Sequence, residues 1–342
     1  MRLPLLFIRV RPLLVLGAGL LAACSGGAAP DDAATGRKVS RPALPAAFSL
    51  PAPGLIAEGL AYDPAGHALY VSTVRGQTIY RLPANGTLRR FSRPADSLSG
   101  VFGLAIDTVR GYLWAATGPV PHLARPGAAA PGVALVRYPL AGGPPRRFPV
   151  PADGRPHLLG DVLPAPDGTV YATDSRTPVL YRLRPGQLHP EPWLNDSLFY
   201  SLQGLALLPG ARTLLLADYH RGVLAVELAT GRVRALTPPP TDKLRGLDGL
   251  CHIGPTTLLA TRNGTAPNRL LRVTLDTVAG AVRAATPLST GPLPDLTLGT
   301  VAAGRFYYIG RSGWAEFDEQ GRPLPGVAPA PARVGSILLP AR

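Results

Sequence analysis

The chain has 342 residues, of which 46% are hydrophobic, and carries a formal charge of +14 from 35 Lys and Arg against 21 Asp and Glu. Its 40 Pro and 39 Gly exceed the usual frequencies, which excludes a mainly helical protein and suits a chain that turns every ten residues or so. Because Cys24 and Cys251 are the only cysteines, a disulfide framework and a cysteine-based zinc site are excluded as well.

The positive charge comes from arginine, since Lys38 and Lys243 are the only lysines. Such a charge raises the question of nucleic-acid binding. No run of basic residues interleaved with aromatic ones occurs, and a genome that favours Arg, Ala and Pro codons produces the same excess. We therefore expect no nucleic-acid partner, while attraction to anionic ligands or surfaces remains open.

The N-terminus has the organisation of a secretory signal. A stretch with three arginines precedes an apolar run over residues 12–21, which is about half as long as a bilayer crossing requires, and Leu21-Ala22-Ala23-Cys24 follows. Residues 1–23 resemble a bacterial lipoprotein signal peptide, which implies lipid attachment at Cys24 and a place in the cell envelope, facing the periplasm or exterior. An ordinary signal peptide is the alternative. Residues 24–40 then form a flexible tether, and residues 41–342 form the folded domain.

Residues 56–82 predict three short antiparallel strands joined by two tight turns. An apolar segment leads to the turn at 63–66, an alternating segment follows over 68–72, and a second turn at 75–76 leads to the strand at 78–82. Pro and Gly supply the backbone angles of the turns, while Val, Ile, Tyr and Thr favour strands.

The same pattern recurs through the chain. Most copies have a small residue near the start of the first strand. The residues directly before this position are 58, 102, 160, 203, 248 and 298. Six copies of a unit that cannot bury both faces alone predict an all-β, six-bladed β-propeller with a central channel. Either residues 47–50 or residues 337–339 would close the ring as an outer strand. The insert at 119–133 should be an extended loop.

Four segments carry a family resemblance: AEGLAYDPAGHALYVS, GDVLPAPDGTVYATDS, QGLALLPGARTLLLADY and LDGLCHIGPTTLLATRNGTAPNRLLRV. They resemble the regucalcin/gluconolactonase (senescence-marker-protein-like) family of six-bladed propellers, although strictosidine-synthase-like and NHL-type propellers share much of the pattern. The resemblance implies a divalent metal, calcium or zinc, at the top of the channel and, in catalytic members, hydrolysis of sugar lactones.

The first residues of the inner strands should surround the channel mouth, namely Glu58, Phe102, Gly160, Gln203, Asp248 and Leu298. In the family the metal ligands are a Glu, two Asn and an Asp. Glu58 and Asp248 match, whereas Gly160 and Gln203 replace the asparagines. The resemblance thus predicts metal ligation by Glu58, Gln203 and Asp248, with Asp161 as a substitute ligand, and hard oxygen donors favour calcium over zinc. Alternatively, both carboxylates are solvated rim charges.

Loop residues should form an outer ring at the same face. Asn263 lies in a family-like segment and should contact a ligand. Arginines follow the second strand in five blades and would form a positive collar that attracts carboxylate or phosphate groups, namely Arg75, Arg176, Arg221, Arg262 and Arg311. The abundance of arginine in the chain is the alternative explanation.

Two functions therefore compete. In a lactonase, the metal would polarise the ring carbonyl and Asp248 would activate water as general base. In a non-catalytic propeller, the mouth would hold a small anionic ligand or a protein partner. Loss of both asparagines favours binding alone, and retention of Glu58 and Asp248 favours hydrolysis. We expect a monomer with a small-molecule ligand, such as a lactone or an acidic sugar derivative.

Overall fold

The computed structural model describes residues 43–84, 86–124, 131–289 and 293–340. The predicted signal peptide (1–23), the tether (24–40) and Cys24 lie outside the described residues. Within the described part of the chain, no helix is long and apolar enough to cross a membrane.

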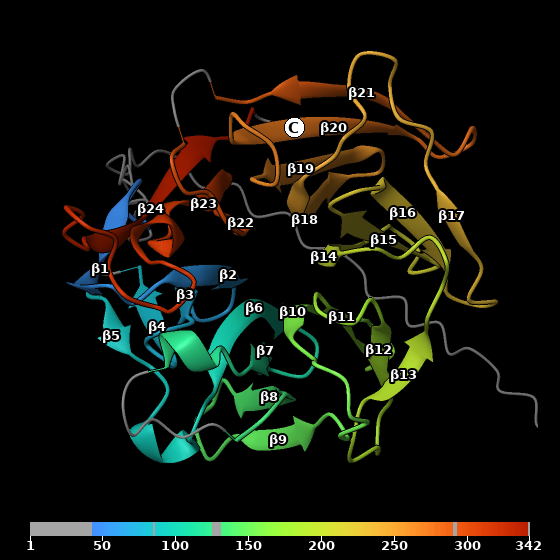
Figure 1. Cartoon of the computed structure of the whole chain (residues 1–342). Coiled ribbons are helices and arrows are strands. Elements are labelled where there is room, and N and C mark those ends of the chain that lie inside the picture. The colour runs from blue at the N-terminus through green and yellow to red at the C-terminus, as the bar shows by residue number, and fades with distance from the viewer. Residues whose placement is uncertain (1–42, 85, 125–130, 290–292, 341–342) are drawn as a thin grey trace, which may run out of the picture. The chain divides into compact units, whose positions relative to one another are not determined.

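Six four-stranded antiparallel sheets succeed one another around a central axis (Figure 1). The predicted six-bladed β-propeller is confirmed. The first blade contains β2 (Ala57–Asp63), β3 (Ala68–Thr73), β4 (Thr78–Pro83) and β5 (Arg89–Arg90). The second contains β6 (Gly100–Asp107), β7 (Tyr112–Gly118), β8 (Ala134–Pro139) and β9 (Arg146–Pro149). The third contains β10 (Leu159–Pro164), β11 (Val170–Asp174), β12 (Leu180–Leu183) and β13 (Glu191–Leu194).

The fourth blade contains β14 (Leu202–Leu207), β15 (Thr213–Asp218), β16 (Gly222–Glu227) and β17 (Val233–Ala235). The fifth contains β18 (Leu247–Gly254), β19 (Thr257–Arg262), β20 (Arg269–Asp276) and β21 (Ala281–Pro287). In each of these five blades the strands follow chain order from the axis outward. The inner strands begin within two residues of the predicted positions, because the turn residues fix where each hairpin reverses.

The sixth blade combines both ends of the folded domain. Its order is β22 (Gly299–Ala302), β23 (Arg305–Arg311), β24 (Pro331–Leu338) and, outermost, β1 (Phe48–Pro53). β1 pairs antiparallel with β24, with Phe48 opposite Val334. Of the two predicted closures, the N-terminal segment supplies the outer strand, whereas the C-terminal residues lie in the third strand. The ring is therefore closed by strand pairing between distant segments.

Glycines in the inner strands allow neighbouring blades to approach closely. A Cβ at Gly59 would overlap the carbonyl oxygen of Phe102, and a Cβ at Gly204 would overlap that of Asp248. Each of these contacts joins one inner strand to the inner strand of the next blade. The repeated small residue thus explains how the positions predicted at the mouth come together.

The core lies mainly between neighbouring blades. Leu215 and Val223 of the fourth blade, for example, pack with Leu258 and Val273 of the fifth. Equivalent clusters join the other neighbouring pairs of blades. Burial of both faces of each sheet is the physical reason why the blades assemble radially.

Helical structure in the described residues is limited to short 3-10 turns, η1 (Pro94–Asp96), η2 (Pro121–Leu123) and η3 (Trp314–Glu316). η2 lies in the insert predicted as an extended loop, of which residues 125–130 are outside the described part. η3 follows β23 in the sixth blade and contributes to the channel mouth.

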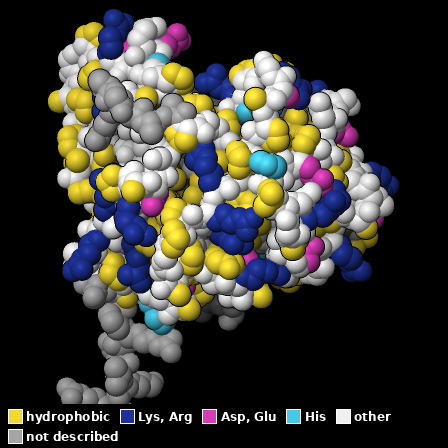
Figure 2. All heavy atoms as spheres, turned by 90° about the horizontal axis from the view of Figure 1, so that it is seen from below, with side chains coloured by type: hydrophobic (Ala, Val, Ile, Leu, Met, Phe, Trp, Pro, Cys, Tyr) yellow, Lys and Arg dark blue, Asp and Glu magenta, His cyan; other side chains and the backbone are white. Residues whose placement is uncertain are grey.

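Basic side chains occur in several separate groups on the face drawn in Figure 2, with apolar and uncharged atoms between them. A single continuous basic stripe, which nucleic-acid binding favours, is not formed on that face.

Candidate functional site

Four of the residues predicted at the mouth line one cavity of about 140 Å³, namely Glu58, Asp161, Gln203 and Asp248. They come from β2, β10, β14 and β18, which are the inner strands of four different blades. Phe102, Gly160 and Leu298 line the same cavity. The first inner-strand residues predicted by the repeat therefore line one cavity.

Glu58 is held by a side chain from the sixth blade. Its Oε2 accepts a hydrogen bond of 2.5 Å from Nε1 of Trp314, which lies in η3. Burial raises the pKa of Glu58 well above its usual range, and the negative charge of Asp248 raises it further. Trp314 was missed by sequence reasoning because no periodicity relates a loop residue of one blade to the inner strand of another.

Asp248 forms a short chain of hydrogen bonds with two neutral side chains. Its Oδ2 accepts from Nδ2 of Asn263 at 2.7 Å, and the hydroxyl of Tyr219 donates to Oδ1 of Asn263 at 2.7 Å. Asp248 is only 4% exposed. Burial raises its pKa to about 7, although the bond from Asn263 acts in the opposite direction. Asn263 thus lies beside Asp248, at the mouth where it was predicted.

Asp161 is engaged by the backbone of two blades. Its Oδ1 accepts from the N–H of Val162 at 2.9 Å, and its Oδ2 accepts from the N–H of Leu205 at 3.1 Å. Burial nevertheless raises its pKa to about 7. Gln203 donates from Nε2 to Oγ of Ser201 at 3.1 Å. Each oxygen of Asp161 retains a lone pair, so the cavity still offers oxygen donors on this side.

The site concentrates negative charge. The carboxylates that act on Glu58 most strongly, Asp248, Asp295 and Asp161, all raise its pKa. A divalent cation would offset this repulsion, and the donors facing the cavity are oxygens of the kind that calcium prefers. No three His, Cys, Asp or Glu side chains among the described residues are grouped closely enough to hold a metal ion. A cation would therefore depend on Glu58 and Asp248 together with neutral oxygens.

A wider cavity of about 450 Å³ shares Glu58 and Trp314 with the first one as lining residues. Asn263, Tyr219 and Asp295 also line it. Asp295 accepts from the N–H of Gly313 at 2.6 Å through Oδ2, which fixes the start of the loop that carries Trp314. This space is large enough for a small ligand.

No family model and no curated protein sequence matches the chain. Among similar solved structures, a gluconolactonase from Xanthomonas campestris shares 17% identity over 77% of this chain and 85% of that one, with a TM-score of 0.54. Regucalcin from Agrobacterium tumefaciens, described as calcium-binding, has 15% sequence identity over 75% of this chain and 83% of its own, with a TM-score of 0.54. Virginiamycin B lyase from Staphylococcus aureus has 12% sequence identity over 78% of this chain and 82% of its own, with a TM-score of 0.55.

The chain shares the fold of these proteins. Their names denote different activities, so the propeller by itself does not determine the chemistry. The chemistry depends on the residues at the mouth.

Two buried aspartates close strands around this mouth. Asp218 accepts from the N–H groups of Tyr200 and Ser201 through Oδ2, and from those of His220 and Arg221 through Oδ1. Asp174 holds the corresponding turn of the third blade. Both side chains are completely buried. They stabilise the turns of the propeller rather than line either cavity.

The five loop arginines differ in their surroundings. Arg262 pairs with Asp242 at 2.6 Å, and Arg311 pairs with Glu316 at 2.8 Å. Arg75 lies 5.0 Å from the ring centre of Phe317. Arg176 and Arg221 are exposed. Local partners thus offset part of the charge of the first three, and the last two are those most accessible to an anionic ligand.

Proposed function

We propose that the channel mouth binds a divalent cation and hydrolyses lactones of sugars or related esters. One observation carries this proposal: Glu58 and Asp248, from the first and fifth blades, line a single small cavity in which their strongest charged neighbours are negative. The similarity of the fold to a gluconolactonase and to a calcium-binding regucalcin supports it.

Glu58 and Asp248 would hold the cation, with the side-chain oxygen of Gln203 as a neutral donor. A set of oxygen donors favours calcium over zinc. When bound, such a cation supplies Lewis-acid polarisation of a lactone carbonyl.

The residues of the chain would perform the proton transfers. Asp248 accepts a proton from water as the water oxygen bonds to the carbonyl carbon, and returns it to the ring oxygen as the ring carbon–oxygen bond breaks. The product is the open hydroxy acid. Asn263 orients Asp248, and Trp314 orients Glu58, through the hydrogen bonds described above.

Calorimetric titration of the purified protein with calcium, followed by a pH-stat assay with glucono-1,5-lactone, tests this proposal. Glu58→Gln and Asp248→Asn should abolish both cation binding and hydrolysis. Glu227→Gln, at the exposed end of β16, is the control and should change neither. Absence of binding with calcium, magnesium, manganese and zinc would show that the proposed site is wrong.

A non-catalytic binding function is the second candidate. The contacts of Asp161 and Gln203 favour it. Asp161 accepts hydrogen bonds from two backbone N–H groups, and Gln203 donates one to Ser201, so these two side chains are not both free to act as metal ligands. In that case a small anionic ligand or a protein partner would occupy the mouth without turnover. Calcium binding in the absence of lactone hydrolysis would favour this candidate.

We also propose that the protein is a lipid-anchored component of a bacterial cell envelope, on the basis of Leu21-Ala22-Ala23-Cys24. Mass spectrometry of the protein from its native membranes should detect a lipid-modified N-terminal Cys24. Recovery of an unmodified chain that begins elsewhere would contradict the anchor.

A further inference from the structure

We propose that the protein has a second ligand site, between the second and third blades, that binds a small monocarboxylate with an apolar body. A cavity of about 500 Å³ lies there, within the size range of small-ligand pockets. Its apolar walls are Pro119, Pro121, Val133, Val150, Pro151 and Pro156. This space shares no lining residue with the cavity around Glu58.

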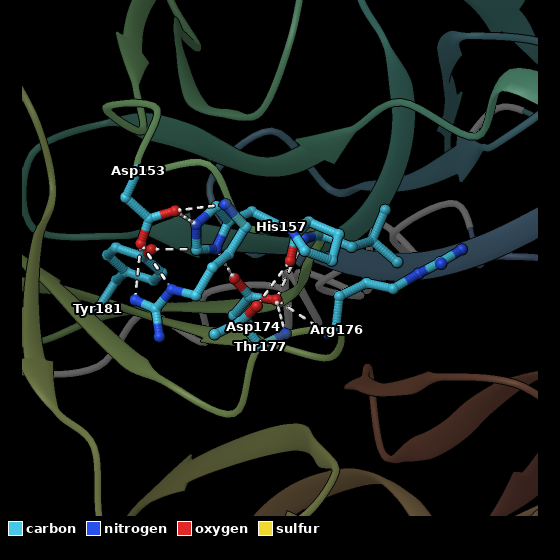
Figure 3. A network of polar contacts seen from close by, with 9 residues as sticks. Asp153, His157, Asp174, Arg176, Thr177 and Tyr181 are labelled. Carbon is cyan, nitrogen blue, oxygen red and sulfur yellow. Dashed lines mark hydrogen bonds and ion pairs between the residues drawn. The ribbon is translucent and has the colours of Figure 1, made fainter.

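The charged residues that line this cavity are all basic. They are Arg155, His157 and Arg176, and no carboxylate lies among the described lining residues. Asp153 and Asp174 contact the ring of His157 through its two nitrogens (Figure 3). Nδ1 lies 2.6 Å from Asp174, and Nε2 lies 2.7 Å from Asp153. A ligand in the cavity would therefore meet basic and apolar side chains, and these two carboxylates offset the charge of Arg155 and His157.

Hydrogen bonds hold the basic wall in place before any ligand arrives. Asp174 is completely buried, and its Oδ1 accepts from the N–H groups of Leu158, Arg176 and Thr177. The hydroxyl of Thr177 donates to the carbonyl of Pro156 at 2.7 Å. The backbone of this wall and the side chain of His157 are fixed in this way and lose little conformational entropy on binding, whereas the Arg176 side chain is ordered by the ligand.

Arg176 is the residue best placed to bind a carboxylate. Arg155 already donates two bonds to Asp153, at 2.6 and 2.8 Å. Within the described residues the guanidinium of Arg176 forms no hydrogen bond or ion pair, and its side chain extends away from the Asp153–His157–Asp174 network (Figure 3). A free guanidinium can donate two parallel N–H bonds to one carboxylate. The apolar walls would bury the remainder of the ligand.

The site is independent of the proposed metal centre, although the two adjoin. Leu158 and Ser175 line the cavity around Glu58, whereas their chain neighbours His157 and Arg176 line the side cavity. Ligand binding to the side cavity should therefore persist after chelation of divalent cations and in Glu58→Gln. The side-cavity proposal and the proposed hydrolysis can thus fail independently of each other.

Titration of the purified protein with benzoate, observed by ligand NMR and calorimetry, tests the inference. Benzamide has the same ring without the charge, and acetate has the charge without the ring. Each should bind at least tenfold more weakly than benzoate. Equal binding of benzoate and benzamide, or no detectable binding of benzoate, would overturn the proposal.

Arg221→Ala is the matched control for Arg176→Ala. Arg176 follows the second strand of the third blade, Arg221 follows the second strand of the fourth blade, and both side chains are exposed. Arg176→Ala should weaken benzoate binding at least tenfold, whereas Arg221→Ala should leave it unchanged. Equal losses in both variants would mean that only the general positive field attracts the anion.

Pro121→Ser, which reduces the apolar wall and keeps the charge, should weaken benzoate binding and leave acetate binding unchanged. Weaker acetate binding in that variant would contradict the assigned wall.

Discussion

The indole nitrogen of Trp314 donates a 2.5 Å hydrogen bond to Oε2 of Glu58, although 256 positions separate the two residues in the chain. A loop of the last blade therefore fixes the carboxylate that the first blade supplies to the mouth. Trp314 lines both the inner cavity and the wider one. The same side chain thus contacts Glu58 and lines both spaces.

Trp314→Phe should reduce the free energy of unfolding by about 1–3 kcal/mol, since a buried acceptor would lose its donor. Calcium affinity should also fall because Glu58 would no longer be held in one orientation. Urea unfolding and calorimetry measure the two effects. Trp193→Phe, on β13 away from the mouth, is the control for removal of an indole. If both variants bind calcium as the unaltered protein does, Trp314 does not position Glu58.

Gly204→Ala should disturb the mouth by displacing β18. The added Cβ would overlap the carbonyl oxygen of Asp248, which is backbone and cannot move alone. We expect a loss of roughly 1–3 kcal/mol in stability from the forced shift, together with loss of cation binding. Gly186→Ala, at a turn where a Cβ would meet nothing within 4 Å, is the control. The Gly186→Ala control has backbone strain from its positive φ but no steric overlap. Unaltered calcium binding in both variants would argue against the close approach of β14 to β18 at Gly204.

Asp218→Ala should cost about 2–4 kcal/mol of stability, because four backbone N–H groups would lose their acceptor. Asp218→Asn should cost less, since the amide keeps one acceptor oxygen. Chemical denaturation gives both values. Asp167→Ala removes an exposed turn carboxylate that binds Thr169 and should cost under about 1 kcal/mol. Equal losses for Asp218→Ala and Asp167→Ala would show that burial of Asp218 adds nothing.

The contribution of His157 to stability should depend on pH. Burial lowers the pKa of His157, but hydrogen bonds to Asp153 and Asp174 and the charges of both raise it further, so the net pKa is above the usual value. A raised pKa means that the folded state binds the proton more tightly than the unfolded state. The stabilisation is therefore complete below the unfolded pKa of about 6.5 and is lost as pH rises through the folded pKa.

Unfolding free energies from pH 5 to 9 should show a difference between the unaltered protein and His157→Gln that shrinks as pH rises. The hydroxyl of Tyr181, 3.3 Å from Nδ1 of His157, and Arg155 are the other polar groups of this network. A His157→Gln difference that stays constant over this range would contradict a charged His157.

Much of the fold could be predicted from the sequence because a blade is local. Turn residues and alternating apolar residues are short-range signals, and their recurrence marks six inner strands. For the same reason Glu58, Asp161, Gln203 and Asp248 could be placed around one axis, since each occupies the start of an inner strand. The closure of the ring remained open between two segments, and the pairing of β1 with β24 decided it.

The contacts that determine the chemistry depend on tertiary structure. Arg262 and Arg311 repeat along the chain like Arg176 and Arg221, yet carboxylates from other loop positions, Asp242 and Glu316, pair with the first two. Periodicity gives no information on such loops because their side chains follow from what packs beside them. The sequence by itself determined the repeat and the residues that face the axis. Only the assembled ring decided that Trp314 donates to Glu58 and the N–H of Leu205 to Asp161, because these hydrogen bonds join blades that no local pattern relates.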